Sequence, residues 1–203
     1  MTSTTTHGRP RGFDREAALD RAVRLFWRKG YETTSVRELG SELGIGQPSL
    51  YNAFSGKRAL FDEAVEVYDR KYGGFVEVAL VEEETAVDAM RRVLTEAPMQ
   101  YTRQGLPCGC LVFGGDAGTD DSDVRAWLSN VRNEKTRGLK GKIQDDVSAG
   151  VLPEDTDVED VAAYVMAVLS GLAQRARDEA PRRELEGIAR IAIAALPRTQ
   201  SHD

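Results

Sequence analysis

The most reactive side chains in this sequence are two cysteines, Cys108 and Cys110, which one glycine separates. Two thiolates at this spacing suit Cu(I) or part of a zinc shell, and an exposed thiol with a lowered pKa can sense oxidants. A closed zinc site needs four ligands, but the two histidines, His7 and His202, lie near the ends of the chain. We favour a third interpretation, in which cysteine acts as a small hydrophobe that lets helices pack closely.

These interpretations belong to different classes of protein. A thiol-disulfide enzyme is disfavoured, because the motif is not Cys-x-x-Cys, no strand-helix-strand pattern surrounds it and no core histidine can act as a base. We therefore expect no enzyme, no metal site and no cofactor. A sensor of oxidants or soft metals that uses Cys108 and Cys110 stays open beside the packing role.

A second group of chemically informative residues consists of Gln47, Ser49 and Asn52, with Pro48 among them. The amides of Gln and Asn can make paired hydrogen bonds with adenine, and proline offers an apolar contact to a thymine methyl group. This chemistry is useful only if the segment enters a groove of DNA. The elements that carry these residues therefore decide the interpretation.

Three helices are predicted around this segment. Apolar residues at helical spacing predict a helix over 15–29. Ser35 and Glu38 stand at the spacing of a capping box, which begins a helix of about two turns. Gly44-Ile45-Gly46 interrupts the pattern, and Pro48 suits the first turn of a third helix. Two short helices joined by a tight turn form a helix-turn-helix, although a plain structural hairpin has the same shape.

The remaining apolar pattern is also helical. We expect helices over 57–72, 86–97, 124–150 and 158–179, and a last one that carries Leu185 to Leu196. The sequence therefore predicts an all-α fold of about nine helices, with an N-terminal three-helix domain and a larger helical domain. The expected division is a flexible arm over 1–12, the helix-turn-helix domain over 13–56, the larger domain over 57–198 and a tail over 199–203.

Charge is distributed unevenly along the 203 residues, whose formal net charge is −6. Residues 1–60 carry ten basic and six acidic side chains, a net charge of +4, so the other 143 residues carry −10. A basic N-terminal part on an acidic body is typical of a protein that meets a polyanion at one end. Chance clustering of solvated helix faces would give the same asymmetry.

The sequence also indicates where in the cell the protein is expected to act. The longest uncharged stretch in the C-terminal half, Val161 to Gln174, is too short to span a bilayer. The first residues contain no apolar core of a secretory signal, and two neighbouring cysteines do not make a disulfide scaffold. We expect a cytoplasmic protein with no membrane contact.

Segment 14–60 resembles the DNA-binding domain of the TetR/AcrR family of bacterial transcriptional regulators. The residues that carry the resemblance are Ala22, Leu25-Phe26, Gly30-Tyr31, Thr34-Ser35, Leu39-Gly40, Leu43-Gly44-Ile45, Leu50-Tyr51, Phe54, Lys57 and Leu60. The resemblance implies a homodimeric, all-helical repressor whose divergent C-terminal domain binds a small molecule. Gly46-Gln47-Pro48-Ser49 and Asn52-Ala53 depart from the common family pattern, so no operator sequence can be transferred.

The helix-turn-helix geometry and the resemblance together predict the DNA-contacting residues. The start of the third helix enters the major groove, which makes Gln47, Pro48, Ser49 and Asn52 the candidates for base contacts. The resemblance adds phosphate contacts by Thr34, Ser35, Tyr51 and Lys57, although Ser35 is equally explained as a helix cap and Tyr51 as core. Arg9 and Arg11, in the arm, could reach a neighbouring groove or phosphates.

The larger domain offers candidates for effector binding and for dimerisation. Apolar and aromatic groups line most ligand sites, and those available here are Met90, Tyr101, Cys110, Phe113, Trp127, Tyr164 and Met166. Small residues permit helices to approach closely in a symmetric four-helix bundle. The expected dimer residues are Ala163, Ala167, Gly171, Ile188 and Ala192.

The leading hypothesis is a ligand-responsive repressor that binds a palindromic operator in double-stranded DNA as a homodimer. Its effector would favour positions of the two N-terminal domains that no longer fit successive grooves. A helical adaptor that binds only protein is the remaining alternative. It would need an apolar outer face on the third helix, whereas Gln47, Ser49 and Asn52 are polar.

Overall fold

The computed structural model describes residues 14–199, which form ten α-helices and one π-helical segment, with no strand in that range. The elements are α1 (Arg15–Lys29), α2 (Val36–Leu43), α3 (Gln47–Phe54), α4 (Lys57–Tyr68), η1 (Asp69–Gly73), α5 (Phe75–Glu82), α6 (Ala86–Tyr101), α7 (Leu111–Gly114), α8 (Ser122–Ser148), α9 (Val158–Arg177) and α10 (Arg182–Ala194). The all-α prediction is confirmed. Arg9, Arg11 and the predicted arm lie outside the described residues.

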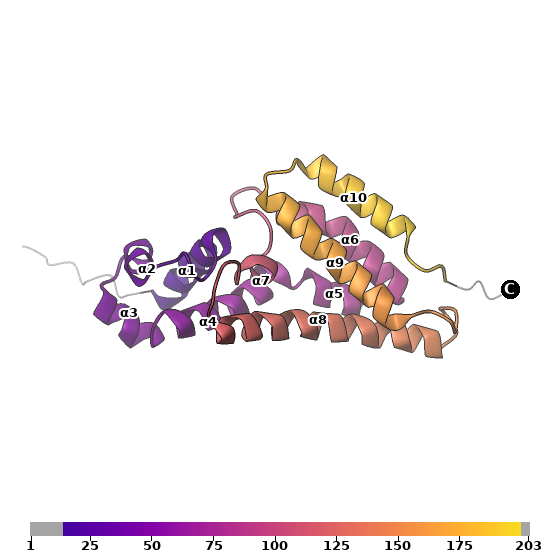
Figure 1. The fold of residues 1–203 in the computed structure, drawn as a ribbon, viewed down its shortest axis with the longest axis horizontal. Helices are drawn as coiled ribbons and strands as arrows, with labels where there is room; N and C mark the ends of the chain where they lie inside the picture. The colour runs from indigo at the N-terminus through magenta and orange to yellow at the C-terminus, as the bar shows by residue number, and fades with distance from the viewer. Residues whose placement is uncertain (1–13, 200–203) are drawn as a thin grey trace, which may run out of the picture.

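The molecule is divided into a head and a body (Figure 1). Helices α1, α2 and α3 form the head at one end, and α4 leads from it into the body. The long helix α8 runs along one side of the body, while α9 and α10 lie on the opposite side. Within residues 14–199, no helix is both long and apolar enough to cross a membrane.

Aromatic packing fixes the head on α4. Phe26 of α1 meets Phe61 of α4 edge to face, with ring centroids 5.0 Å apart, and Trp27 meets Tyr68 in the same way at 4.8 Å. All four rings are buried. Edge-to-face pairs of this kind contribute about 0.5 to 1.5 kcal/mol beyond the burial of their area. Because Phe61 lies near the start of α4 and Tyr68 at its end, α1 and the whole of α4 form one packed unit.

The helix pattern differs from the prediction in the middle of the chain. The predicted helix over 57–72 is α-helical only to Tyr68 and continues as the π-helical segment η1. Helix α5 was not predicted, because its apolar residues are spread around the whole helix and show no helical period. Helix α7 has four residues, too few for a period to be read. With these two helices added to the eight that were located in the sequence, the described residues contain ten α-helices, close to the predicted total of about nine.

A buried cation joins three elements of the body. Lys135 of α8, whose side chain is 6% exposed, forms ion pairs with Asp69 of η1 at 2.7 Å and with Glu77 of α5. Burial alone would lower the pKa of Lys135, but the Glu77 and Asp69 carboxylates outweigh it and hold this pKa above its ordinary value. The π-helical turn is thus anchored to α8 by charge.

Replacing Lys135 by alanine leaves two carboxylates beside each other without their cation. We expect the free energy of unfolding to fall by about 2 kcal/mol, less than for a fully buried pair, because both carboxylates are partly exposed. The midpoint of urea unfolding measures the loss. Arg137→Ala is the control, since this α8 side chain is 70% exposed and its loss should cost less than about 0.5 kcal/mol. Equal losses in both variants would contradict the anchoring role.

Candidate nucleic-acid interface

The turn between α2 and α3 is built from glycine. Gly44 ends α2 in the left-handed conformation, at φ 70° and ψ 30°, a region where glycine carries no steric penalty. The N–H of Ile45 then donates to the carbonyl of Gly40 at 2.9 Å. A Cβ at Gly40 would lie 2.8 Å from the Ile45 carbonyl oxygen. The two helices can therefore approach closely enough to form the predicted helix-turn-helix.

Helix α3 presents a polar face to solvent. Gln47, Pro48, Ser49 and Asn52 are all exposed, as predicted for residues that contact bases. Tyr51 is 54% exposed, so its ring is not part of the core. The opposite side of the helix is anchored by buried residues of the head core, Leu50 and Phe54. The geometry makes this face available to a DNA groove; the contacts themselves remain predictions.

Ser35 caps the N-terminus of α2. Its hydroxyl accepts a hydrogen bond from the Glu38 N–H at 3.1 Å, which is the first half of the predicted capping box. The Glu38 carboxylate pairs with Lys29 of α1 at 2.7 Å and also accepts from the Ser35 backbone, as the second half of the box requires, and both contacts lower the pKa of Glu38. Ser35 remains exposed at a helix N-terminus, a position that favours anions.

Thr34 does not fit the predicted role in phosphate binding. Its side chain is 0% exposed, and its hydroxyl donates to the carbonyl of Gly30 at 2.7 Å. This bond satisfies a backbone acceptor just past the end of α1, so the hydroxyl is directed into the head. The prediction that the Thr34 side chain contacts phosphate is therefore wrong.

Lys57 lies at the start of α4 in a half-buried position. Its ammonium group is 4.1 Å from the centroid of the Tyr31 ring and 3.5 Å from the Glu32 carbonyl oxygen. Burial lowers the pKa of Lys57, although the Glu32 and Asp121 carboxylates oppose the shift. The ammonium is thus held by a cation–π contact near the head surface.

The cysteine pair is split between the surface and the core. Cys108 is exposed, whereas Cys110 is buried just before α7. Burial raises the pKa of the Cys110 thiol, even though a hydrogen bond with Tyr68 opposes the shift. A buried thiol with a raised pKa is a poor nucleophile, which agrees with the packing interpretation for Cys110. Within residues 14–199, no three His, Cys, Asp or Glu side chains are grouped so as to hold a metal ion.

Two of the predicted effector residues line an apolar cavity in the body. Met90 and Met166 bound a space of about 10 Å³ enclosed by α5, α6, α8 and α9. Tyr101 and Cys110 are buried outside its lining, and Phe113 and Trp127 are half-buried. Tyr164 is 38% exposed on α9 and lies outside the lining of this cavity.

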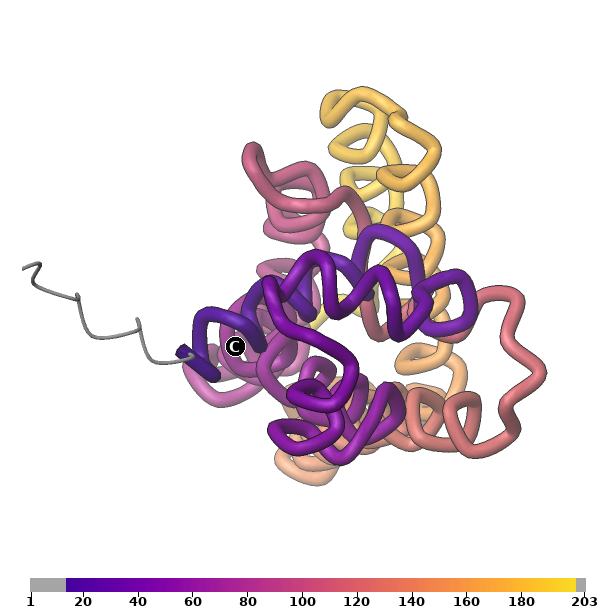
Figure 2. Tube along the Cα trace, turned by 90° about the vertical axis from the view of Figure 1, so that its left-hand side faces the viewer, coloured from indigo at the N-terminus to yellow at the C-terminus, as the bar shows by residue number. Residues whose placement is uncertain are grey.

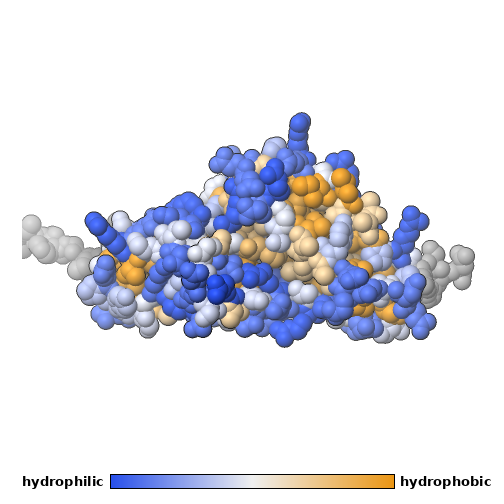
Figure 3. All heavy atoms as spheres, viewed as in Figure 1, coloured by the Kyte–Doolittle hydropathy of each residue, from blue (hydrophilic) through white to orange (hydrophobic). Residues whose placement is uncertain are grey.

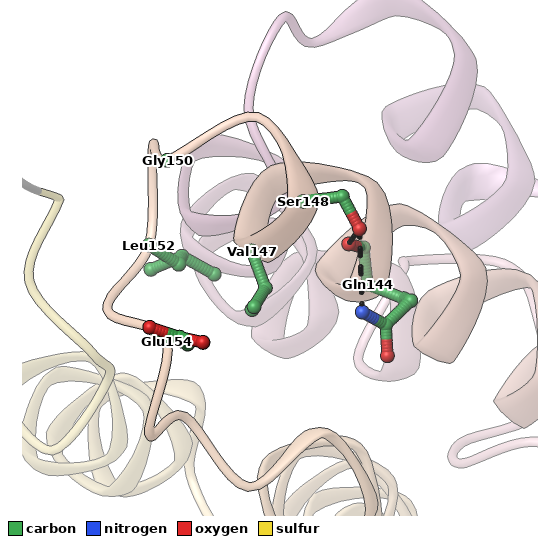
Figure 4. A pocket seen from close by; sticks show the side chains of 6 residues that line it. All are labelled: Gln144, Val147, Ser148, Gly150, Leu152 and Glu154. Atoms are coloured by element: carbon green, nitrogen blue, oxygen red, sulfur yellow. Dashed lines mark hydrogen bonds between the residues drawn. The ribbon is translucent and has the colours of Figure 1, made fainter.

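A larger hollow of about 650 Å³ lies where α8 ends (Figure 4). It is lined by Gln144 and Ser148 of α8 and by Leu152 and Glu154 of the following loop. The Ser148 hydroxyl donates to the Gln144 carbonyl at 2.8 Å, so part of the polar lining is already paired. The hollow is open to solvent and contains none of the predicted effector residues.

Helices α9 and α10 expose an apolar face, which appears as an orange area over these helices in Figure 3. Ala163, Ala167 and Gly171 are exposed on α9, as predicted for dimer residues, and Ile188 of α10 is partly exposed. Ala192 is 2% exposed and faces the body core, so its prediction as a contact residue is wrong. Ile191, 75% exposed, takes that place on the outer face of α10.

Head and body also meet through the segment between α7 and α8, which lies beside the head in Figure 2. The N–H of Tyr31 donates to the Gly115 carbonyl at 2.8 Å. The hydroxyl of Thr119 donates to the Glu32 carboxylate at 2.7 Å. These contacts place the head in a defined orientation on the body, in addition to the covalent link through α4.

A helix-turn-helix head on a helical body defines a class of DNA-binding transcriptional regulators. Residues 18–64 match the family model described as "Bacterial regulatory proteins, tetR family". Residues 86–192 match the model described as "Tetracyclin repressor-like, C-terminal domain". The chain therefore belongs to the TetR family of bacterial transcriptional regulators, as the resemblance of segment 14–60 predicted.

Individual relatives extend this similarity over nearly the whole chain. The HTH-type transcriptional repressor ComR of Escherichia coli (strain K12) is 29% identical, over 95% of this chain and 93% of ComR. The uncharacterized HTH-type transcriptional regulator YezE of Bacillus subtilis (strain 168) is 37% identical, over 78% of this chain and 83% of YezE. A cysteine mutant of the TetR family regulator CifR, solved with 26 bp double-strand operator DNA, has a TM-score of 0.87 at 37% identity, covering 93% of this chain and 100% of that one.

Thr34→Val tests the reassignment of Thr34. Valine keeps the shape of the side chain but leaves the Gly30 carbonyl without its hydrogen bond, so the free energy of unfolding should fall by about 1 to 2 kcal/mol. DNA affinity of the folded protein should be unchanged. Urea unfolding measures the loss of stability. A DNA titration without urea, at a temperature where the variant is folded, measures the affinity. Weaker DNA binding at full stability would restore the phosphate role.

Proposed function

We propose that this protein is a ligand-responsive repressor, which binds a palindromic operator as a homodimer and leaves it when a small-molecule effector binds. The observation that carries the proposal is the exposed polar face of α3, with Gln47, Ser49 and Asn52 presented by a helix-turn-helix. The repressor ComR and the operator complex of CifR support this function by similarity. A DNA-binding regulator of this kind acts in the cytoplasm.

Recognition divides into base contacts and phosphate contacts. The amides of Gln47 and Asn52 are free to meet base edges when α3 lies in the major groove, while Pro48 offers an apolar contact. Ser35 at the start of α2 and Tyr51 on α3 are exposed beside this face and serve as phosphate donors. Lys57 adds positive charge at the start of α4.

Dimerisation uses the outer face of α9 and α10. Ala163, Ala167 and Gly171 have small side chains, so α9 can approach a symmetry-related helix closely. Ile191 adds an exposed aliphatic side chain that a partner would cover. Two heads held by one four-helix bundle would read two half-sites whose spacing the dimer fixes.

Effector binding uses the apolar cavity among α5, α6, α8 and α9. At about 10 Å³ it is closed to any ligand, so an effector must displace Met90 and Met166, whose flexible side chains adapt readily. An apolar or weakly polar molecule suits this lining. Because α5 follows η1 directly and α4 precedes it, opening the cavity would shift the equilibrium between head positions.

Selection of bound sequences from random double-stranded DNA at two salt concentrations tests the proposed function. We expect one palindrome to be enriched, with affinity that falls as salt rises. The double variant Gln47→Ala, Asn52→Ala should lower the preference for this palindrome about 100-fold, because each amide pair contributes about 1 to 3 kcal/mol. Asn130→Ala, Gln144→Ala removes two exposed amides from α8 and serves as the control. No enrichment by folded, ligand-stripped protein would refute operator recognition.

Ile191→Glu tests the dimer surface. A charge at the centre of an apolar interface has no partner there, so the variant should be monomeric and bind the palindrome weakly. Light scattering should give about twice the chain mass of 22.3 kDa for the wild type and a single chain mass for the variant. Val81→Glu is the control, because Val81 is 84% exposed on α5, away from this face. If the Ile191→Glu variant were still dimeric, the outer face of α9 and α10 would be excluded as the dimer interface.

A further inference from the structure

Arg177, in the last turn of α9, reaches across the molecule to the head. Its Nη2 donates to the backbone carbonyl of Trp27 in α1 at 3.2 Å and to that of Cys110 at 3.0 Å. Trp27 and Arg177 are 150 residues apart in the sequence. One side chain of the body therefore joins the end of α1, the start of α7 and the end of α9.

The bond to Trp27 is part of the C-terminal cap of α1. The Phe26 carbonyl is satisfied by the N–H of Gly30, and the Lys29 carbonyl by the Thr33 hydroxyl. The N–H of Tyr31 would be the next helical donor for the Trp27 carbonyl, but it donates to Gly115 of the body. Arg177 takes its place, and a cation is favourable at this end of a helix.

Two glycines make room for the Arg177 side chain. A Cβ at Gly114 would lie 2.5 Å from Arg177 Cζ, and one at Gly109 would lie 2.7 Å from Arg177 Cγ. Both distances are far below van der Waals contact, so the guanidinium occupies space that only glycine leaves open. Gly109, before α7, and Gly114, within α7, therefore allow the Arg177 side chain to reach α1.

We propose that Arg177 is a positioning residue for operator recognition: it couples the dimer-forming helix α9 directly to α1 and so sets the separation of the two recognition helices. This inference rests on the proposed function. The head is held to the body by α4, whose α-helix gives way to the π-helical turn η1, and by the contacts of α1. Without Arg177, the head keeps α4 and the bonds of Tyr31 and Glu32 to the segment after α7, but it loses its direct link to α9.

Operators with altered spacing test this role. The palindrome enriched by the wild type is compared with versions in which the half-sites are one base pair closer or farther apart. In Arg177→Gln and Gly114→Ala, the ratio of affinities for correct and altered spacing should fall about tenfold, within the usual range of coupling between sites. Arg182→Gln is the control, because Arg182 donates to the Thr102 carbonyl, and both residues belong to the body rather than the head. A uniform loss of affinity at all spacings would overturn the proposal.

Gly114→Ala separates positioning from simple loss of a side chain. It leaves Arg177 in the sequence but displaces its guanidinium, so it should reproduce the Arg177→Gln phenotype. In the double variant Arg177→Gln, Gly114→Ala, the methyl group at position 114 meets no guanidinium, so Gly114→Ala should have little effect beyond that of Arg177→Gln alone. Full additivity of the two substitutions would contradict a shared mechanism.

Amide hydrogen exchange tests the contact without DNA. Exchange over residues 26–34 should be at least about fivefold faster in Arg177→Gln and Gly114→Ala than in the wild type and in Arg182→Gln. Unchanged exchange would overturn the proposed contact. This measurement distinguishes failure of the proposed function from failure of the Arg177 inference. If the wild type enriches no palindrome, operator recognition is refuted. The exchange rates test the Arg177 contact whether or not a palindrome is found.

Discussion

The position of the recognition helix depends on how the C-terminal end of α1 is held. This end carries Phe26 and Trp27, which pack edge to face on α4. It is also where backbone groups of the head bond to the body rather than to their own helix. Because an unpaired buried carbonyl costs about 1 to 3 kcal/mol, the head is strongly biased toward the orientation that satisfies these groups. The geometry of α2 then follows from its packing on α1, and that of α3 from its packing on α2 and α4.

Electrostatics complements this packing in the body. Lys135 holds the π-helical turn and α5 against α8 through carboxylates from both. The apolar cavity lies on the same helices, lined by Val76, Leu80 and Leu139. A change in the cavity therefore acts on elements that are already linked by charge to the end of α4. This arrangement gives a physical route from the body interior to the head.

Local patterns in the sequence were sufficient to predict the helices of the head and the outer helices of the body. The helix-turn-helix follows from glycine in the turn, proline in the first turn of α3 and inward-facing Leu50, all of which act over a few residues. The error at Ala192 is a matter of register, since one residue rotates a helix position by 100° and Ile191 faces outward instead. Thr34 was misplaced because its bond to Gly30 is visible only in three dimensions. The contacts of Arg177 and Lys135 join residues that are distant in sequence, which no local pattern encodes.

The closed state of the cavity among α5, α6, α8 and α9 has a consequence for the sensitivity of the response. Under the proposed function, an effector would bind only to the fraction of molecules in which the cavity has opened, so the apparent dissociation constant would equal the intrinsic one divided by that fraction. Core packing thereby sets the concentration threshold at which a cell would respond. Substitutions that loosen the lining would lower this threshold without touching either the effector or the DNA, which makes the threshold easy to adjust during evolution.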